Sequence, residues 1–169
     1  MSKIVNVPTT KDNEKVNINR NAIEHRATWM GLIMDEAKKA GIDLEPVARK
    51  AVGRCGCFHG MTVYKKNMKT PESLLAFAVV FSSDLTLKTF DMEIVKRTEE
   101  EFIIHFNYCP LVSAWQKQGF SDEDIDTYCD IAMDGDRLIA SSFDTFDFRL
   151  GATIAKGDKH CEVCFLKKT

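Results

Sequence analysis

The chain has 169 residues, of which 44% are hydrophobic and 28% are charged, and its formal net charge at pH 7 is −2. This composition is typical of a globular protein that buries about two thirds of its unfolded surface in one domain. The small net charge argues against general binding to nucleic acid or anionic membranes, and no apolar run reaches the roughly 18 residues needed to span a bilayer. The first residues lack the apolar segment of a secretory signal, so the six cysteines are expected to be thiols, ligands or a nucleophile of a cytoplasmic protein.

The first half of the sequence predicts helices that follow a polar arm. Residues 1–16 lack sustained periodicity and are interpreted as a flexible arm, leaving 17–169 as a single domain. Apolar residues recur at helical spacing from about residue 19 to 40, where a glycine follows as a stop. Asp43 can cap a second helix, and Thr70-Pro71 opens a third.

The hydrophobic period changes to two at about residue 90, which predicts a hairpin of strands 90–95 and 102–109. The apolar faces of the two strands lie on the same side of the sheet only if, for each pair of residues that face each other across the hairpin, the two residue numbers add up to an even number. Glu93 is therefore expected near His105 or Asn107 on the opposite face.

Two helices and two strands are predicted after the hairpin. A short helix covers 111–118, and the capping box that begins at Ser121 opens a longer one. Strands are predicted at 146–154 and 161–166. The predicted fold class is therefore α+β, with a helical N-terminal half packed on an antiparallel sheet of about four strands in β-β-α-α-β-β order.

Two cysteine patterns suggest metal or redox chemistry but have ordinary explanations. Cys55-Gly56-Cys57 has one residue between its thiols, whereas zinc sites usually have two to four. Cys161 and Cys164 have the spacing of a redox pair, but residues three apart on a strand point to opposite faces.

A polar row alternates with the aromatic residues of strand 102–109 and ends in a thiol. His105, Asn107 and Cys109 are expected to project to the same side, and Pro110 ends the strand. On the longer helix that begins at Ser121, steps of three and four residues place the Cys129 thiol and the Asp136 carboxylate along one face. The elements are expected to converge at one end of the sheet, which gives the candidate set His105, Asn107, Cys109, Cys129, Asp136 and Cys161.

This set has three interpretations that residue spacing leaves open. It can be a catalytic site with Cys109 as nucleophile, His105 as base and Asp136 or Glu93 as orienting carboxylate. It can instead bind zinc or iron through its three thiols and an imidazole. The third interpretation is that the cysteines are small buried hydrophobes and the histidine is a satisfied sheet residue.

Three arginines are candidates to bind a substrate carboxylate, because the planar guanidinium matches its geometry. They are Arg54, Arg137 and Arg149, and each is also explained as an ordinary surface charge. Cys129 and Cys161 are expected to line the same substrate site.

Five motifs of the C-terminal half form a recognisable pattern: Asn107-Tyr-Cys-Pro-Leu, Trp115 with Gly119, Cys129-Asp-Ile-Ala-Met-Asp-Gly-Asp136, Phe146 through Leu150, and Gly157-Asp-Lys-His-Cys-Glu162. Over about residues 88–167 the chain resembles the L-2-amino-thiazoline-4-carboxylic acid hydrolase family. The resemblance implies addition of water to the ring carbon between nitrogen and sulfur, cleavage of the carbon–sulfur bond, and N-carbamoyl-L-cysteine as product. It leaves open whether Cys109 attacks that carbon or a carboxylate activates water directly.

The sequence thus predicts a cytoplasmic hydrolase of a small cyclic substrate that needs no cofactor, with Cys109 as the main catalytic candidate. The alternative is a non-catalytic, sensor-like module that binds a small molecule, or zinc or iron through Cys109, Cys129 and Cys161. A small-molecule substrate is the expected partner, nucleic acid and membranes are not, and homo-oligomerisation stays open.

Overall fold

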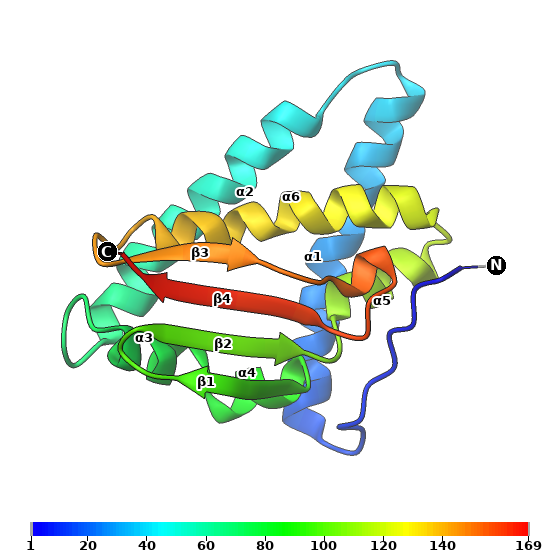
Figure 1. Cartoon of the computed structure of the whole chain (residues 1–169). Coiled ribbons are helices and arrows are strands. Elements are labelled where there is room, and N and C mark those ends of the chain that lie inside the picture. Colours follow the sequence, from blue (N-terminus) through cyan, green and yellow to red (C-terminus); the bar gives the residue numbers. More distant parts are fainter. Residues whose placement is uncertain (1, 169) are drawn as a thin grey trace.

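The computed structural model describes residues 2–168, which form a layer of helices against an antiparallel sheet (Figure 1). The described residues contain six α-helices: α1 (Glu14–Lys39), α2 (Glu45–His59), α3 (Leu74–Phe81), α4 (Asp84–Thr89), α5 (Pro110–Lys117) and α6 (Asp122–Ala140). A π-helical segment, η1 (Gly60–Lys65), continues α2, and a 3-10 turn, η2 (Ile154–Lys156), precedes the last strand. The strands are β1 (Met92–Arg97), β2 (Glu101–Phe106), β3 (Phe146–Leu150) and β4 (Cys161–Lys167). The predicted α+β class, helical first half and β-β-α-α-β-β order are confirmed.

The strands are ordered β1-β2-β4-β3, and every neighbouring pair is antiparallel. Glu93 lies opposite His105, as the alignment of apolar faces predicts, and a bulge between Ile94 and Lys96 then shifts the register. Phe102 and Ile104 are fully buried, whereas the residues that alternate with them on β2 are half-buried. The sheet therefore has one face in the core and one face open to solvent.

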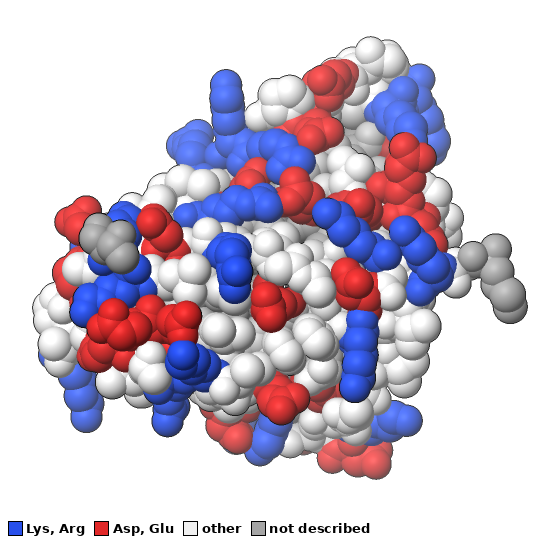
Figure 2. Space-filling view, viewed as in Figure 1, with Lys and Arg blue, Asp and Glu red and all other residues white. Residues whose placement is uncertain are grey.

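Figure 1 shows the helices behind the sheet and the open face of the sheet toward the viewer. Helix α6 packs against α2 and touches β3, while α1 packs against α5. On the open side, basic and acidic side chains are interspersed over the sheet and over α2 and α6 (Figure 2).

The start of β1 and the end of β2 differ from the prediction. The predicted strand 90–95 begins at Met92, because α4 occupies the preceding residues and is capped by Ser83, whose side chain accepts a hydrogen bond from the Thr86 N–H. The predicted strand 102–109 ends at Phe106. Beyond it, Asn107 hydrogen-bonds to the carbonyl of Asp91 through both its backbone N–H and its side-chain amide.

Side-chain caps also explain two other differences. Helix α1 begins at Glu14, ahead of the expected residue 19, because the Asn13 side chain accepts from the Val16 N–H. The predicted strand 146–154 stops at Leu150, and Thr153 caps η2 instead.

The core between sheet and helices is organised around Phe77 of α3. This fully buried ring lies 4.7 Å from the ring of Phe165, 5.0 Å from Phe146 and 5.3 Å from Phe143, measured between centroids. Aromatic rings at these separations attract one another beyond the effect of burial alone. No helix within residues 2–168 has the length and apolarity needed to cross a membrane.

Phe77→Ala is expected to lower the free energy of unfolding by about 3–5 kcal/mol, because it leaves a cavity among several rings. Val79→Ala is the matched control on the same helix, since Val79 is 63% exposed, and it should change stability by less than about 0.5 kcal/mol. Urea denaturation followed by circular dichroism measures both. Equal effects of the two changes would contradict this description of the core.

Candidate functional site

Cys109 lies at the N-cap of α5, immediately before Pro110 at the first helical position. Its backbone is extended, with φ −130° and ψ 112°, and proline at the next position is preorganised to start the helix. The residue is half-buried. Burial raises the pKa of the Cys109 thiol, and the N–H groups of Val112 and Leu111 oppose this by favouring the thiolate. The thiol is therefore protonated at neutral pH and needs a base to act as a nucleophile.

Two further thiols lie close enough to Cys109 to interact with it electrostatically. Cys129 comes from α6 and Cys161 from the start of β4, and both are buried. Burial raises the pKa of Cys161 to about 12 and that of Cys129 well above its ordinary value. Both residues belong to the core cluster against which Cys109 packs, and the Cys161 Sγ accepts a hydrogen bond from the Ile154 N–H at 3.3 Å. The expected convergence of Cys109, Cys129 and Cys161 is thus present.

Asp136 of α6 supplies a carboxylate near Cys109. Burial raises the pKa of Asp136 to about 6, and the positive charges of Arg26 and Arg137 act in the opposite direction. The negative charge of this carboxylate helps to raise the pKa of the Cys109 thiol and of the Tyr64 hydroxyl on η1. A carboxyl group that titrates near neutral pH is suited to general acid–base work.

Arg26 of α1 completes this group and was not singled out from the sequence. Its positive charge opposes the rise in pKa that burial causes at Cys109, Asp136 and Tyr64. The Arg26 side chain itself is exposed. Within residues 2–168 no carboxylate lies within ion-pair distance of the Arg26 guanidinium. No local pattern marks this arginine, because it is one of many charged residues on a long amphipathic helix. We call Cys109, Asp136, Arg26 and Tyr64 the thiol–carboxylate site.

His105 lies on the other face of the sheet, so the predicted common face of His105 and Cys109 is wrong. His105 pairs with Glu162 across β2 and β4, and its Nε2 lies 3.7 Å from a carboxylate oxygen of Glu162. The next pair in the register, Phe106 and Cys161, points into the core. The His105 ring stacks on His160 with 3.7 Å between centroids. The alternation fails because β2 ends before Cys109, and the chain turns inward there.

The other predicted polar residues are placed apart from the thiol. Asn107 donates its side-chain amide to the Asp91 carbonyl at 3.0 Å, so this amide holds a turn. Glu93 stays with His105 on the open face. Arg149 also lies on that face, where its Nη2 is 3.5 Å from the Cys164 Sγ and 3.9 Å from Glu162.

Arg137 and Arg54 are not directed at the site. Arg137 forms ion pairs of 2.6 Å with Asp130 and with Asp134 on its own helix. Arg54 is exposed on α2 and lines a shallow surface groove with Leu138.

In the part of the chain that the structure describes, the cysteines are neither paired in disulfides nor grouped as metal ligands. No three His, Cys, Asp or Glu side chains of residues 2–168 are arranged as ligands of one metal ion. All six cysteines within this range are free. Cys161 faces the core and Cys164 the open side, as their spacing on a strand predicts.

Comparison with known families matches residues 20–165 to the sequence model of the L-2-amino-thiazoline-4-carboxylic acid hydrolases. The chain belongs to this family. The match extends the resemblance seen in the C-terminal half to α1, α2 and η1, and so includes Arg26 and Tyr64.

A comparison with curated proteins finds no match. Among solved structures, the chain is similar to a trafficking protein particle complex subunit 3 from Naegleria fowleri, described as covalently bound to palmitic acid. The identity is 14%, the alignment covers 94% of this chain and 85% of that chain, and the TM-score is 0.34.

Asp136→Asn is expected to stabilise the protein above pH 6. A carboxyl whose pKa is raised from 3.8 to about 6 by folding favours the folded state below its unfolded pKa, and this contribution is lost as the pH rises through 6. The neutral amide avoids that loss, so the variant should gain about 1–3 kcal/mol at pH 7.5 and nothing at pH 3.5. Denaturant unfolding at both pH values measures the difference. A variant that is less stable at pH 7.5 would show that ionised Asp136 is stabilised by its surroundings.

Proposed function

We propose that this chain is a hydrolase that opens a small ring at an amidine-type carbon, with Cys109 and Asp136 as the reacting groups. The family name supports the substrate class, because L-2-amino-thiazoline-4-carboxylate has such a carbon between nitrogen and sulfur and also carries a carboxylate. The observation that carries the proposal is that a half-buried thiol, a half-buried carboxylate and an exposed guanidinium, from three different helical segments, lie close enough to influence one another's charge.

Arg26 is proposed to bind the substrate carboxylate. An arginine that forms no ion pair with the described residues can offer its planar fork to a carboxylate and make a bidentate pair. This interaction would place the ring between α1 and the start of α5, with its amidine carbon toward Cys109. Tyr64, whose pKa is raised to about 12 mainly by burial, keeps its proton at neutral pH and serves as a hydrogen-bond donor there.

In the first step Asp136 takes the Sγ proton of Cys109 as the sulfur attacks the amidine carbon. The bond from that carbon to the ring sulfur then breaks, and the departing sulfur receives the proton from Asp136. The product of this step is an open-chain isothiourea attached to Cys109. The helix N–H groups of Leu111 and Val112 favour negative charge on the Cys109 sulfur and so assist its formation.

In the second step water replaces the enzyme sulfur. Asp136 takes a proton from the water, the oxygen adds to the same carbon, and the carbon–sulfur bond to Cys109 breaks as the thiol regains its proton. The product is a urea with a free thiol, which is N-carbamoyl-L-cysteine for the substrate of the family name. Direct attack of water on the ring, without the thiol, is the competing route.

Cys109→Ala and Asp136→Asn are each expected to lower kcat/KM for thiazoline ring opening by about 10²–10⁴-fold, since each removes a nucleophile or a base. The wild-type kcat/KM should rise with pH through about 6, the pKa to which burial raises Asp136. Cys164→Ala removes a buried thiol on the opposite side of the sheet and serves as control, with activity unchanged within about twofold.

Three other outcomes of this assay are decisive. Full activity of Cys109→Ala with loss in Asp136→Asn would establish direct attack by water. Full activity of both variants would refute the site. Stoichiometric binding of the thiazoline by wild-type protein without turnover would instead identify a binding module.

Arg26→Met is expected to lower kcat/KM by about 10–100-fold, mostly through KM, because a charge-assisted pair with the substrate carboxylate is lost. Arg54→Met is the matched control, since Arg54 is also an exposed helical arginine but lies outside the site. Steady-state kinetics measure both variants. An equal loss in the two would show that net charge, and not the position of Arg26, attracts the substrate.

A further inference from the structure

Residues 2–13 form an N-terminal strap without regular secondary structure, which runs alongside the sheet end that carries α5 (Figure 1). The Ile4 side chain is 5% exposed and belongs to the core. The Ile4 carbonyl accepts from the Gln116 side chain at 3.0 Å, and Asp122 accepts from the Ser2 hydroxyl at 2.6 Å and the Lys3 N–H at 2.9 Å. The expected flexible arm therefore makes specific contacts with α5 and α6.

Asn6 lies at the centre of the strap and pairs with the backbone of Cys109. Its Nδ2 donates to the Cys109 carbonyl at 2.9 Å, and its Oδ1 accepts from the Cys109 N–H at 2.9 Å. The flanking side chains of Val5 and Val7 are 73% and 64% exposed, so the extended strap turns Asn6 inward and the two valines outward. One carboxamide thus binds both polar backbone groups of the reactive residue.

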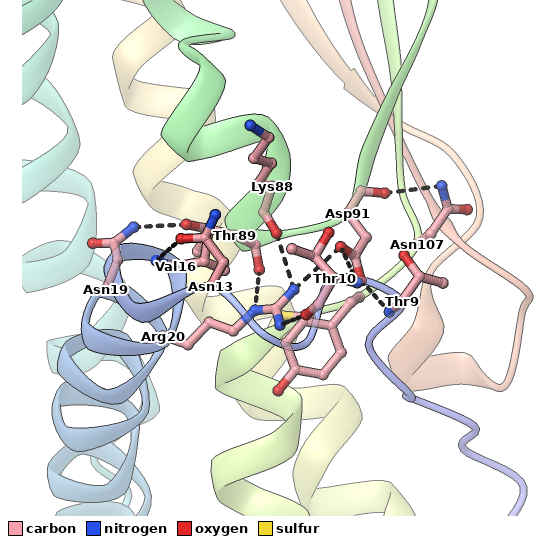
Figure 3. Close-up of polar contacts among 12 residues, drawn as sticks. Thr9, Thr10, Asn13, Val16, Asn19, Arg20, Lys88, Thr89, Asp91 and Asn107 are labelled. Atoms are coloured by element: carbon pink, nitrogen blue, oxygen red, sulfur yellow. Dashed lines mark hydrogen bonds and ion pairs between the residues drawn. The ribbon is translucent and has the colours of Figure 1, made fainter.

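A second anchor holds the other end of the strap and the residues just before Cys109 (Figure 3). The Asp91 carboxylate accepts from the Thr9 N–H at 2.6 Å and from the Thr10 N–H at 3.2 Å. The carbonyl of the same residue accepts from Asn107. Contacts at both ends of the strap therefore hold Asn6 in place, and its side chain stays aligned with the Cys109 backbone.

We infer that Asn6 is a positioning residue that fixes the Cys109 backbone at the N-cap of α5, and with it the place of the thiol. The N–H of an N-cap residue has no partner within the helix and would otherwise turn toward water. Rotation of this peptide moves the thiol from its place at the N-terminus of α5, where the helix dipole favours a thiolate, and misplaces it toward the substrate. The structural inference stands on the Asn6 contacts alone, and only its catalytic consequence rests on the proposed function.

The test is the rate of Cys109 modification by methyl methanethiosulfonate as a function of pH, in full-length protein that carries Cys55→Ser and Cys57→Ser. These changes remove the two more accessible competing thiols outside the site. Asn6→Ala should shift the pH dependence upward and slow the reaction at pH 7.5 by at least about threefold, through a smaller thiolate fraction. Val5→Ala, its exposed neighbour, should leave the profile unchanged.

Two further measurements separate positioning from folding and from function. Asn6→Asp is the second variant, to be used if Asn6→Ala fails to fold. It keeps the acceptor for the Cys109 N–H and loses the donor to the Cys109 carbonyl, so its pH dependence should shift upward by less than the shift expected for Asn6→Ala. In the ring-opening assay, Asn6→Ala should lower kcat by about tenfold with KM unchanged within about twofold. A folded Asn6→Ala protein with the wild-type pH profile overturns the inference. A shifted profile in a protein without turnover supports the inference and refutes the hydrolase.

Discussion

The buried ion pair between Arg20 and Asp91 connects the segments that position the thiol. Both side chains are almost fully buried, at 6% and 5% exposure, and their charged atoms lie 3.2 Å apart. The same guanidinium donates to the carbonyls of Thr89 at 2.8 Å and Lys88 at 2.9 Å, and it lies 4.5 Å from the centre of the Tyr108 ring. One cation thus fixes α1, the end of α4 and the exit from β2.

The arrangement around this pair satisfies the conditions under which a buried charge is stable. Burial raises the pKa of Asp91, but hydrogen bonds from Thr10 and Thr9 and the charge of Arg20 outweigh it and leave the pKa below its ordinary value. The carboxylate therefore favours the folded state above its unfolded pKa, and this contribution disappears as the pH falls through the folded pKa. Asp91 also has a positive φ of 46°, which aspartate tolerates better than most residues. Removal of either partner would leave the other charge buried and unpaired, at a cost of about 3–5 kcal/mol.

The aromatic core that stabilises the fold and the thiol–carboxylate site lie in different parts of the molecule. An aromatic core between α3 and the sheet supplies the rigid support, and the polar thiol–carboxylate site lies among the helices where β2 ends and β4 begins. Burial raises the pKa of Asp136 there to about 6, so this carboxyl weakens the fold at neutral pH, which is consistent with its proposed role as acid and base. The open face of the sheet carries the stacked histidines and takes no part in the proposed reaction.

Local signals in the sequence predicted most elements correctly. Ser121 and Pro110 mark helix starts. The apolar alternation predicted that Glu93 lies near His105 or Asn107, and the structure pairs it with His105. The prediction of the site failed where alternation was extended past the end of a strand. That strand ends because Asn107 bonds to Asp91, a contact that spans 16 residues and has no local signature.

Arg26 of the thiol–carboxylate site and Asn6, which binds the Cys109 backbone, are both far from Cys109 along the chain. Asn6 and Cys109 are separated by 103 positions, and Arg26 belongs to the first helix. Nothing in the periodicity of a polar arm or an amphipathic helix distinguishes these residues from their neighbours. Their placement follows from tertiary contacts, so only the three thiols and Asp136 could be predicted as site residues from the sequence.

The most direct test of the account is whether the thiazoline substrate protects Cys109 from modification. Wild-type protein would be treated with methyl methanethiosulfonate at increasing substrate concentrations on a time scale shorter than turnover, and labelling of the peptide that contains Cys109 would be followed by mass spectrometry. Protection should saturate at a substrate concentration near KM, and Arg26→Met should need at least about tenfold more substrate for the same protection. Unchanged labelling of Cys109 at a substrate concentration that saturates turnover would place the reaction elsewhere on the molecule and contradict the account.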